Sequence, residues 1–294
     1  MTESQHNRIR TRPIWAFTKR RKNNAQFKNE LVLTGLFTAI IIIMAFTPLG
    51  YIPLVVINAT IIHIPVILGS LFCGPKKGAF LGFVFGFTSC LKATIVGGTL
   101  SSFVFSPVLA ASLVGTSGIF KSLFIAFVPR ILVGVIPYFV YIGIKKVLAS
   151  EKKNLWGTVL NVLMSVFLAF GVYAFLGKMS ESLSQAAALG IGIAVGAVVF
   201  IVVEAVFIRK STQVIPFVYA GVAGAMTNTL LVIGSIFVLY KDAYADAIGV
   251  AGNAVLGVIT GVISFNGVIE AIVAAIIVYL VGLVLNTIKP IAAK

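Results

Sequence analysis

The chain has 294 residues, of which 59% are hydrophobic and only 11% are charged. A soluble domain of this size carries far more charge on its surface, so this composition excludes a soluble globular protein. The formal net charge of +15 would suit nucleic acid, but the basic residues cluster in short polar segments between apolar runs. We therefore expect an all-α polytopic membrane protein that contacts the lipid bilayer and no nucleic acid.

Eight apolar segments are long enough to cross a bilayer core of about 30 Å, which needs roughly 20 residues per helix. They lie near 29–47, 56–73, 78–97, 119–146, 155–177, 184–208, 214–240 and 266–287. The apolar stretch 247–263 is short and rich in Gly and Ala, and we interpret it as a re-entrant or interfacial helix. The irregular stretch 98–118 is either a lid over a cavity or a plain connection.

Lysine and arginine predict the orientation. With the N-terminus placed in the cytoplasm, 18 of the 23 basic residues fall in cytoplasmic segments. Positive residues favour the cytoplasmic side, so both termini are expected there. The chain then divides into a basic cytoplasmic tail over 1–28 and a single transmembrane domain over 29–290.

Catalytic motifs are absent from the sequence, which has no HExxH, no GxSxG and no Walker A pattern. We expect no enzyme, no cofactor and no metal site. Cys73 and Cys90 lie in apolar segments without metal-type spacing and are interpreted as small buried hydrophobic residues. Without a nucleotide-binding loop, active transport by this chain would need an ATPase from another protein.

One charged residue lies deep inside a predicted span. A charge at the centre of a membrane helix costs about 2.5–3.5 kcal/mol and usually faces the protein interior. Arg130 lies about eleven residues into the span 119–146, and Tyr138 and Tyr141 follow it at helical spacing. This face would present one cation and two phenols to a cavity. Alternatively, Arg130 forms a structural ion pair with Glu270, and the two roles are compatible.

Two later spans carry further polar residues. Thr227, Asn228 and Thr229 lie at mid-membrane depth, while Asn266 and Glu270 are four residues apart near the outer end of the last span. Polar side chains at this depth need partners. These residues therefore either line a ligand cavity or form hydrogen bonds between helices.

Small residues recur at helical spacing, which lets helix backbones approach closely. Gly78, Gly82 and Gly86 form a GxxxGxxxG pattern in the third span, and Gly35 and Ala39 form a shorter pair in the first.

Several segments together resemble the S components of energy-coupling-factor (ECF) transporters. They are 33–40 (LTGLFTAI), 58–66 (NATIIHIPV), 68–78 (LGSLFCGPKKG), 81–86 (LGFVFG), 102–107 (SFVFSP), 128–134 (VPRILVG), 227–234 (TNTLLVIG) and 266–272 (NGVIEAI). The likeness covers about 28–148 and 213–290. It implies a six-helix bundle, here a core of 29–148 and 213–290 with two additional transmembrane helices over 154–208 inserted between core helices four and five.

The resemblance also implies a function and a set of partners. An S component sits in the bacterial cytoplasmic membrane, binds a vitamin from outside, and docks on a membrane coupling protein driven by two ATPase subunits. The docking surface of the family includes a small-residue face on the first helix, which corresponds here to Gly35 and Ala39.

The segments 102–107 and 128–134 are most similar to those of members that bind pantothenate. Arg130 would then bind a carboxylate through its planar fork, and Tyr138 and Asn228 would bond hydroxyl and amide groups. Phe103, Asn266 and Glu270 complete the expected substrate-binding set. Riboflavin, folate or another vitamin is an alternative substrate. A stand-alone secondary transporter is the alternative class, although the sequence lacks the clear internal repeat that such a protein favours.

Overall fold

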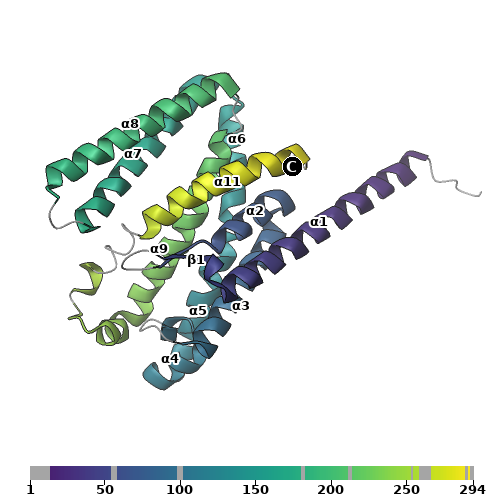
Figure 1. The fold of residues 1–294 in the computed structure, drawn as a ribbon. Helices are drawn as coiled ribbons and strands as arrows, with labels where there is room; N and C mark the ends of the chain where they lie inside the picture. Colours follow the sequence, from purple (N-terminus) through teal and green to yellow (C-terminus); the bar gives the residue numbers. More distant parts are fainter. Residues whose placement is uncertain are drawn as a thin grey trace, which may run out of the picture.

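The computed structural model describes residues 14–53, 58–97, 102–179, 183–210, 214–252, 254–257, 266–288 and 291. Over these residues the chain is helical apart from one short two-stranded hairpin (Figure 1). The helices are α1 (Ile14–Phe46), α2 (His63–Cys73), α3 (Pro75–Ile95), α4 (Pro107–Val114), α5 (Thr116–Val133), α6 (Ile136–Leu148), α7 (Lys153–Met179), α8 (Gln185–Lys210), α9 (Val214–Ile248) and α11 (Val268–Ile288). The shorter elements are η1 (Pro48–Gly50), β1 (Tyr51–Pro53), β2 (Asn58–Thr60) and η2 (Ser102–Val104).

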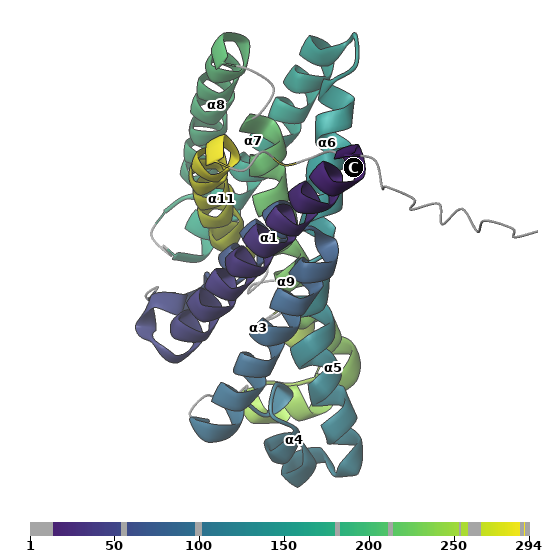
Figure 2. The same ribbon diagram turned by 90° about the vertical axis from the view of Figure 1, so that its right-hand side faces the viewer.

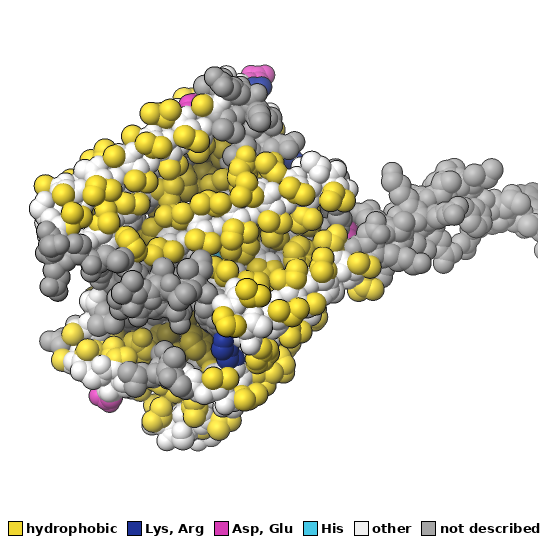
Figure 3. Space-filling view, viewed as in Figure 1, with side chains coloured by type: hydrophobic (Ala, Val, Ile, Leu, Met, Phe, Trp, Pro, Cys, Tyr) yellow, Lys and Arg dark blue, Asp and Glu magenta, His cyan; other side chains and the backbone are white. Residues whose placement is uncertain are grey.

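Six helical stretches of the described residues are long and apolar enough to cross a membrane. They are Pro75–Ile95, Thr116–Leu148, Lys153–Gly177, Gln185–Ala205, Ile215–Ile248 and Val268–Ile288. The first two predicted spans correspond to shorter apolar helical segments, Glu30–Phe46 and His63–Cys73. Hydrophobic side chains are spread widely over the face shown in Figure 3, and Lys, Arg, Asp and Glu appear on it at few places, as expected for a protein surrounded by lipid. The chain is therefore a multi-pass membrane protein.

Helix α1 is longer than the first predicted span, because its helical backbone begins at Ile14 rather than near residue 29. The segment 14–28 contains neither Gly nor Pro, and residues without these breakers continue a helix readily. The N-terminal half of α1 projects beyond the other helices (Figures 1 and 2).

The second predicted span is split between a strand and a helix. Strands β1 and β2 pair antiparallel, with Tyr51 opposite Thr60, so only 11 residues remain for α2. All residues of α2 are buried, because α1, α3, α6, α9 and α11 pack around it. A helix that is apolar on every side is stable only when it is enclosed in this way.

The fourth predicted span is not one continuous helix. Helix α5 ends at Val133 and α6 starts at Ile136, with a turn at Gly134 and Val135 between them. Pro137 stands in the first turn of α6, where its missing N–H costs nothing and its fixed φ suits a helix start. Helix α9 also bends, at Tyr240, where the predicted seventh span ends.

Two irregular stretches were predicted outside the spans. Within 98–118, η2 and α4 form short helical elements and residues 98–101 lie outside the described residues. Within 247–263, residues 255–257 form one helical turn, while 253 and 258–263 lie outside the described residues.

Helices α7 and α8 pack mainly against each other and touch the rest of the bundle through α7. Gly192 and Gly196 of α8 lie directly against Ala169 of α7. A polar network joins the two helices at their other end: Thr158 and Asn161 of α7 donate hydrogen bonds of 2.7 and 2.9 Å to the carboxylate of Glu204 on α8.

Helices α3 and α5 meet backbone to backbone along the GxxxGxxxG face. A Cβ added at Gly78, Gly82 or Gly86 would collide with the backbone carbonyl of Gly134, Arg130 or Ala126, respectively. The three glycines thus allow a contact that no larger residue permits, as expected for helices packed within a membrane.

This contact predicts the effect of a single methyl group. We expect Gly82→Ala to destabilise the protein by about 1–3 kcal/mol, because the methyl group forces α3 away from the backbone of α5. Thermal unfolding of the detergent-purified protein measures the effect. Gly143→Ala in α6 is the matched control, since a Cβ there meets no atom within 4 Å. Equal stability of the two variants would contradict the close contact.

Candidate functional site

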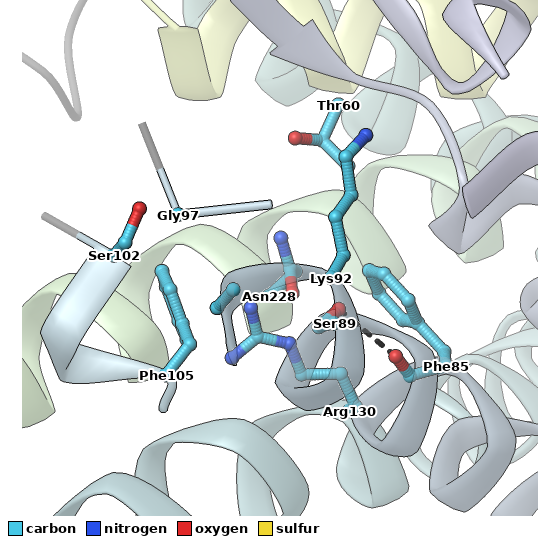
Figure 4. A pocket seen from close by; sticks show the side chains of 10 residues that line it. Thr60, Phe85, Ser89, Lys92, Gly97, Ser102, Phe105, Arg130 and Asn228 are labelled. Atoms are coloured by element: carbon cyan, nitrogen blue, oxygen red, sulfur yellow. Dashed lines mark hydrogen bonds between the residues drawn. The ribbon is translucent and has the colours of Figure 1, made fainter. Parts of the chain in front are cut away.

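A cavity of about 320 Å³ opens between α3, α5, α9, β2 and the stretch around η2 (Figure 4). The residues that line it are Thr60, Phe85, Ser89, Lys92, Ala93, Gly97, Ser102, Phe105, Arg130 and Asn228. A volume of this order is at the lower end of the range for small-molecule sites, roughly 300–1,000 Å³. The cavity mixes apolar and aromatic walls with a few polar groups, as such sites usually do.

The position of Arg130 follows from the proline before it. Pro129 lies inside α5 and has no N–H, so the carbonyl of Ile125, four residues earlier, loses its helical partner. The guanidinium of Arg130 donates from Nη1 to that carbonyl at 2.5 Å. The same contact satisfies a backbone acceptor within the membrane and fixes the buried cation at the cavity wall.

Two aromatic rings pack against the planar guanidinium group of Arg130. Its central carbon lies 4.7 Å from the ring centroid of Phe105 and 5.5 Å from that of Phe85, distances at which a cation is attracted to the π face. Phe105 is held in place by its neighbour Ser106, whose hydroxyl caps α4 by accepting from the N–H of Leu109. The Ser106 hydroxyl also lies 2.8 Å from that of Thr94 on α3, which fastens this stretch over the cavity.

One face of α3 supplies a second set of lining residues. Phe85, Ser89 and Lys92 stand at positions i, i+4 and i+7, so they share a face of the helix. The Ser89 hydroxyl donates to the carbonyl of Phe85 at 2.9 Å, which leaves its oxygen available as an acceptor toward the cavity. Lys92 was not among the residues predicted to bind substrate; its spacing from Phe85 and Ser89 is the signal in the sequence that would have placed it in the site.

Asn228 brings a polar group from α9 to the cavity. Its side chain is 8% exposed, and its Oδ1 atom receives no hydrogen bond within the described part of the chain. A buried acceptor without a partner costs about 1–3 kcal/mol. A donor from a bound molecule would remove that cost.

The cavity is electropositive. Lys92 and Arg130 both line it, and none of the described lining residues is acidic. Inside a region of low dielectric such a pair of cations attracts an anion much more strongly than in water. The arrangement therefore suits a small molecule with one negative charge and several hydrogen-bonding groups.

Two of the residues predicted to bind substrate lie away from this cavity. The turn at Gly134 and Val135 separates α5 from α6, so Arg130 and Tyr138 stand on different helices. The Tyr138 ring packs edge-on against Phe139. Phe103 is buried in a separate apolar cluster, with its ring 5.3 Å from that of Tyr240. Its neighbours Ser102 and Phe105 line the cavity instead.

Glu270 and Asn266 also lie outside the lining residues. The carboxylate of Glu270 accepts hydrogen bonds of 2.8 Å from the backbone N–H of Thr60 and from the hydroxyl of Thr229. The charge of Arg130 also acts on this carboxylate. Glu270 thus joins β2, α9 and α11 behind the Thr60 wall of the cavity. Asn266 is 8% exposed and stands just before α11.

The predicted docking residues Gly35 and Ala39 are both exposed on α1. A Cβ added at Gly35 would meet no atom within 4 Å, so this face is open to another helix.

Because Glu270 accepts a hydrogen bond from Thr229, removing the Thr229 hydroxyl should lower the stability of the protein. We expect Thr229→Val to lower the free energy of unfolding by about 1–2 kcal/mol, because a buried carboxylate loses one of its partners. Thermal unfolding in detergent measures this change. Thr287→Val on the exposed side of α11, where the hydroxyl bonds only its own helix, is the control. If both variants unfold at the same temperature, the Thr229–Glu270 bond contributes nothing.

Comparison with known proteins gives the family. A region of 119 residues is 48% identical to the "Pantothenic acid transporter PanT" of Lactococcus lactis subsp. cremoris and covers 39% of this chain and 59% of that protein. The "Pantothenate transporter PanT" of Leuconostoc mesenteroides subsp. mesenteroides is 26% identical over 269 residues, 90% of this chain and 94% of that relative. The family profile described as "ECF transporter, substrate-specific component" matches residues 29–208. The chain therefore belongs to the family of ECF transporter substrate-specific components, as its sequence motifs predicted.

Proposed function

We propose that this protein is the high-affinity pantothenate-binding subunit of an ECF vitamin importer. The observation that carries the proposal is the cavity of about 320 Å³ with Arg130 and Asn228 in its wall and no acidic residue among its described lining. Pantothenate has one carboxylate, one amide and two hydroxyl groups. The names of the two relatives support this choice of vitamin.

Arg130 would bind the carboxylate. Its guanidinium is held by Ile125 and by two aromatic rings, so it is positioned before the ligand arrives, and an arginine fork matches a carboxylate in geometry. Asn228 would accept a hydrogen bond from a hydroxyl or amide donor through its unpartnered Oδ1. Tyr138, Phe103, Asn266 and Glu270 would act on binding only through the packing of the surrounding helices.

The proposed topology has eight membrane-inserted segments, of which the two short ones are Glu30–Phe46 within α1 and His63–Cys73, which is α2. A basic tail over 1–28 precedes a single transmembrane domain over 29–290, and 154–208 forms a helix pair inserted between core helices four and five. Lys76 and Lys77 stand at the N-terminal end of α3, whereas the cavity residues Ser89 and Lys92 stand in its C-terminal half. With the basic end in the cytoplasm, the cavity opens toward the outside and both termini lie inside.

The proposed partners are a membrane coupling protein and two ATPase subunits. Docking would use the open face of α1 at Gly35 and Ala39, where the absence of bulky side chains lets a partner helix approach.

Binding of the vitamin tests the proposal directly. Titration of the detergent-purified protein with pantothenate, riboflavin and folate should show tight binding of pantothenate alone. Arg130→Ala should weaken it roughly 10- to 100-fold, the value of a lost charge-assisted hydrogen bond, and Arg130→Lys should weaken it less. Lys146→Ala, which removes a cation at the exposed end of α6, is the control. Unchanged affinity in Arg130→Ala, or tight binding of another vitamin instead, would refute the assignment.

The docking surface is tested separately from binding. We expect Gly35→Leu and Ala39→Leu to reduce pantothenate uptake by cells roughly tenfold or more while the affinity of the purified protein stays unchanged, because a larger side chain keeps the partner helix away. Gly190→Leu on α8, another position with no atom within 4 Å, should leave uptake intact. Normal uptake in the α1 variants would exclude this face.

A further inference from the structure

Lys92 contacts two parts of the molecule at once. It lines the cavity, and its Nζ atom donates a hydrogen bond of 3.0 Å to the backbone carbonyl of Ala45. Ala45 stands in the last turn of α1, which ends at Phe46. The final four carbonyls of a helix have no partner within it, and they carry the negative end of the helix dipole. Lys92 therefore stabilises the end of α1 from a position in the cavity wall.

A bound carboxylate would compete with Ala45 for this ammonium group. Charge-assisted hydrogen bonds to a carboxylate are shorter and stronger than those to an amide carbonyl. Figure 4 shows Lys92 and Arg130 bordering the same cavity, so an anion held by Arg130 is exposed to the charge of Lys92. A ligand shifts the equilibrium between two conformations of a protein only if its interactions with the two conformations differ. The Lys92–Ala45 hydrogen bond is a contact of this kind.

We infer that Lys92 is shared between the carboxylate of the ligand and the last turn of α1, and so couples occupancy of the cavity to the order of that turn. The inference rests on the proposed function, since it requires an anionic ligand. It also connects two surfaces that are otherwise separate, because α1 carries the exposed docking residues Gly35 and Ala39. Occupied and empty protein would then present α1 to a partner differently.

The experiment uses a pair of ligands that differ at one group. Panthenol has a CH₂OH group where pantothenate has its carboxylate, and Lys92→Met keeps the aliphatic stem without the charge. Lys92→Met should weaken pantothenate binding about 10- to 100-fold and change panthenol binding by less than about twofold. Lys241→Met, which removes an exposed cation on α9, should change neither.

Hydrogen exchange of the backbone amides in 43–50 reports the coupling. In the wild-type protein, pantothenate should accelerate exchange there because the end of α1 loses its cap, and saturating panthenol should not. In Lys92→Met the exchange should be fast already and insensitive to pantothenate. The wild-type comparison needs no variant, so it stands even if Lys92→Met fails to fold.

Three outcomes would overturn the inference while leaving the proposed function intact. The first is an unchanged affinity of Lys92→Met for pantothenate. The second is an equal loss of affinity for pantothenate and for panthenol in this variant. The third is a rate of amide hydrogen exchange in 43–50 of the wild-type protein that does not respond to pantothenate. A wild-type protein that binds no pantothenate would overturn the proposed function and the inference with it.

Discussion

Three glycines of α3 allow the backbone of α5 to pack directly against it, and the cavity depends on this contact. Gly82 touches the carbonyl of Arg130 itself, so the residue that carries the buried charge is located by backbone packing. The C-terminal half of α3 then brings Phe85, Ser89 and Lys92 to the same space. Within hydrocarbon, helices gain little from burying apolar surface against each other, and close van der Waals packing determines their arrangement.

The cavity also requires that a cation be stabilised in the membrane interior. Pro129 removes one backbone donor, which leaves the Ile125 carbonyl free to accept from Arg130. Phe85 and Phe105 cover the guanidinium faces. The guanidinium is thus held at the cavity wall by a carbonyl and two rings. Glu270 accepts hydrogen bonds from Thr60 and Thr229, and the charge of Arg130 also acts on its carboxylate.

Most of the helices could be predicted from the length of the apolar segments. The placement of Arg130 and Asn228 in one cavity could also be predicted, because charged and amide side chains are rare enough at membrane depth to indicate function. The predictions that differ from the structure concern segments whose conformation depends on local backbone features. The turn at Gly134 and Val135 separates Tyr138 from Arg130, and nothing in hydropathy marks it. The pairing of β1 with β2, which shortens the second span, is set by contacts across the hairpin. Lys92 was not among the residues predicted to bind substrate, although its spacing from Phe85 and Ser89 places the three on one face of α3.

The complete burial of α2 has a consequence for biogenesis. An 11-residue helix reaches only about 16 Å, too short to cross a bilayer by itself. Its enclosing neighbours include α9 and α11, which are synthesised long after it. During synthesis α2 therefore stays incompletely covered while α3 to α8 are inserted, and the hydrogen bond of Glu270 to Thr60 in the cavity wall forms only after α11 is made. Loss of α11 would leave one side of α2, an early part of the chain, uncovered.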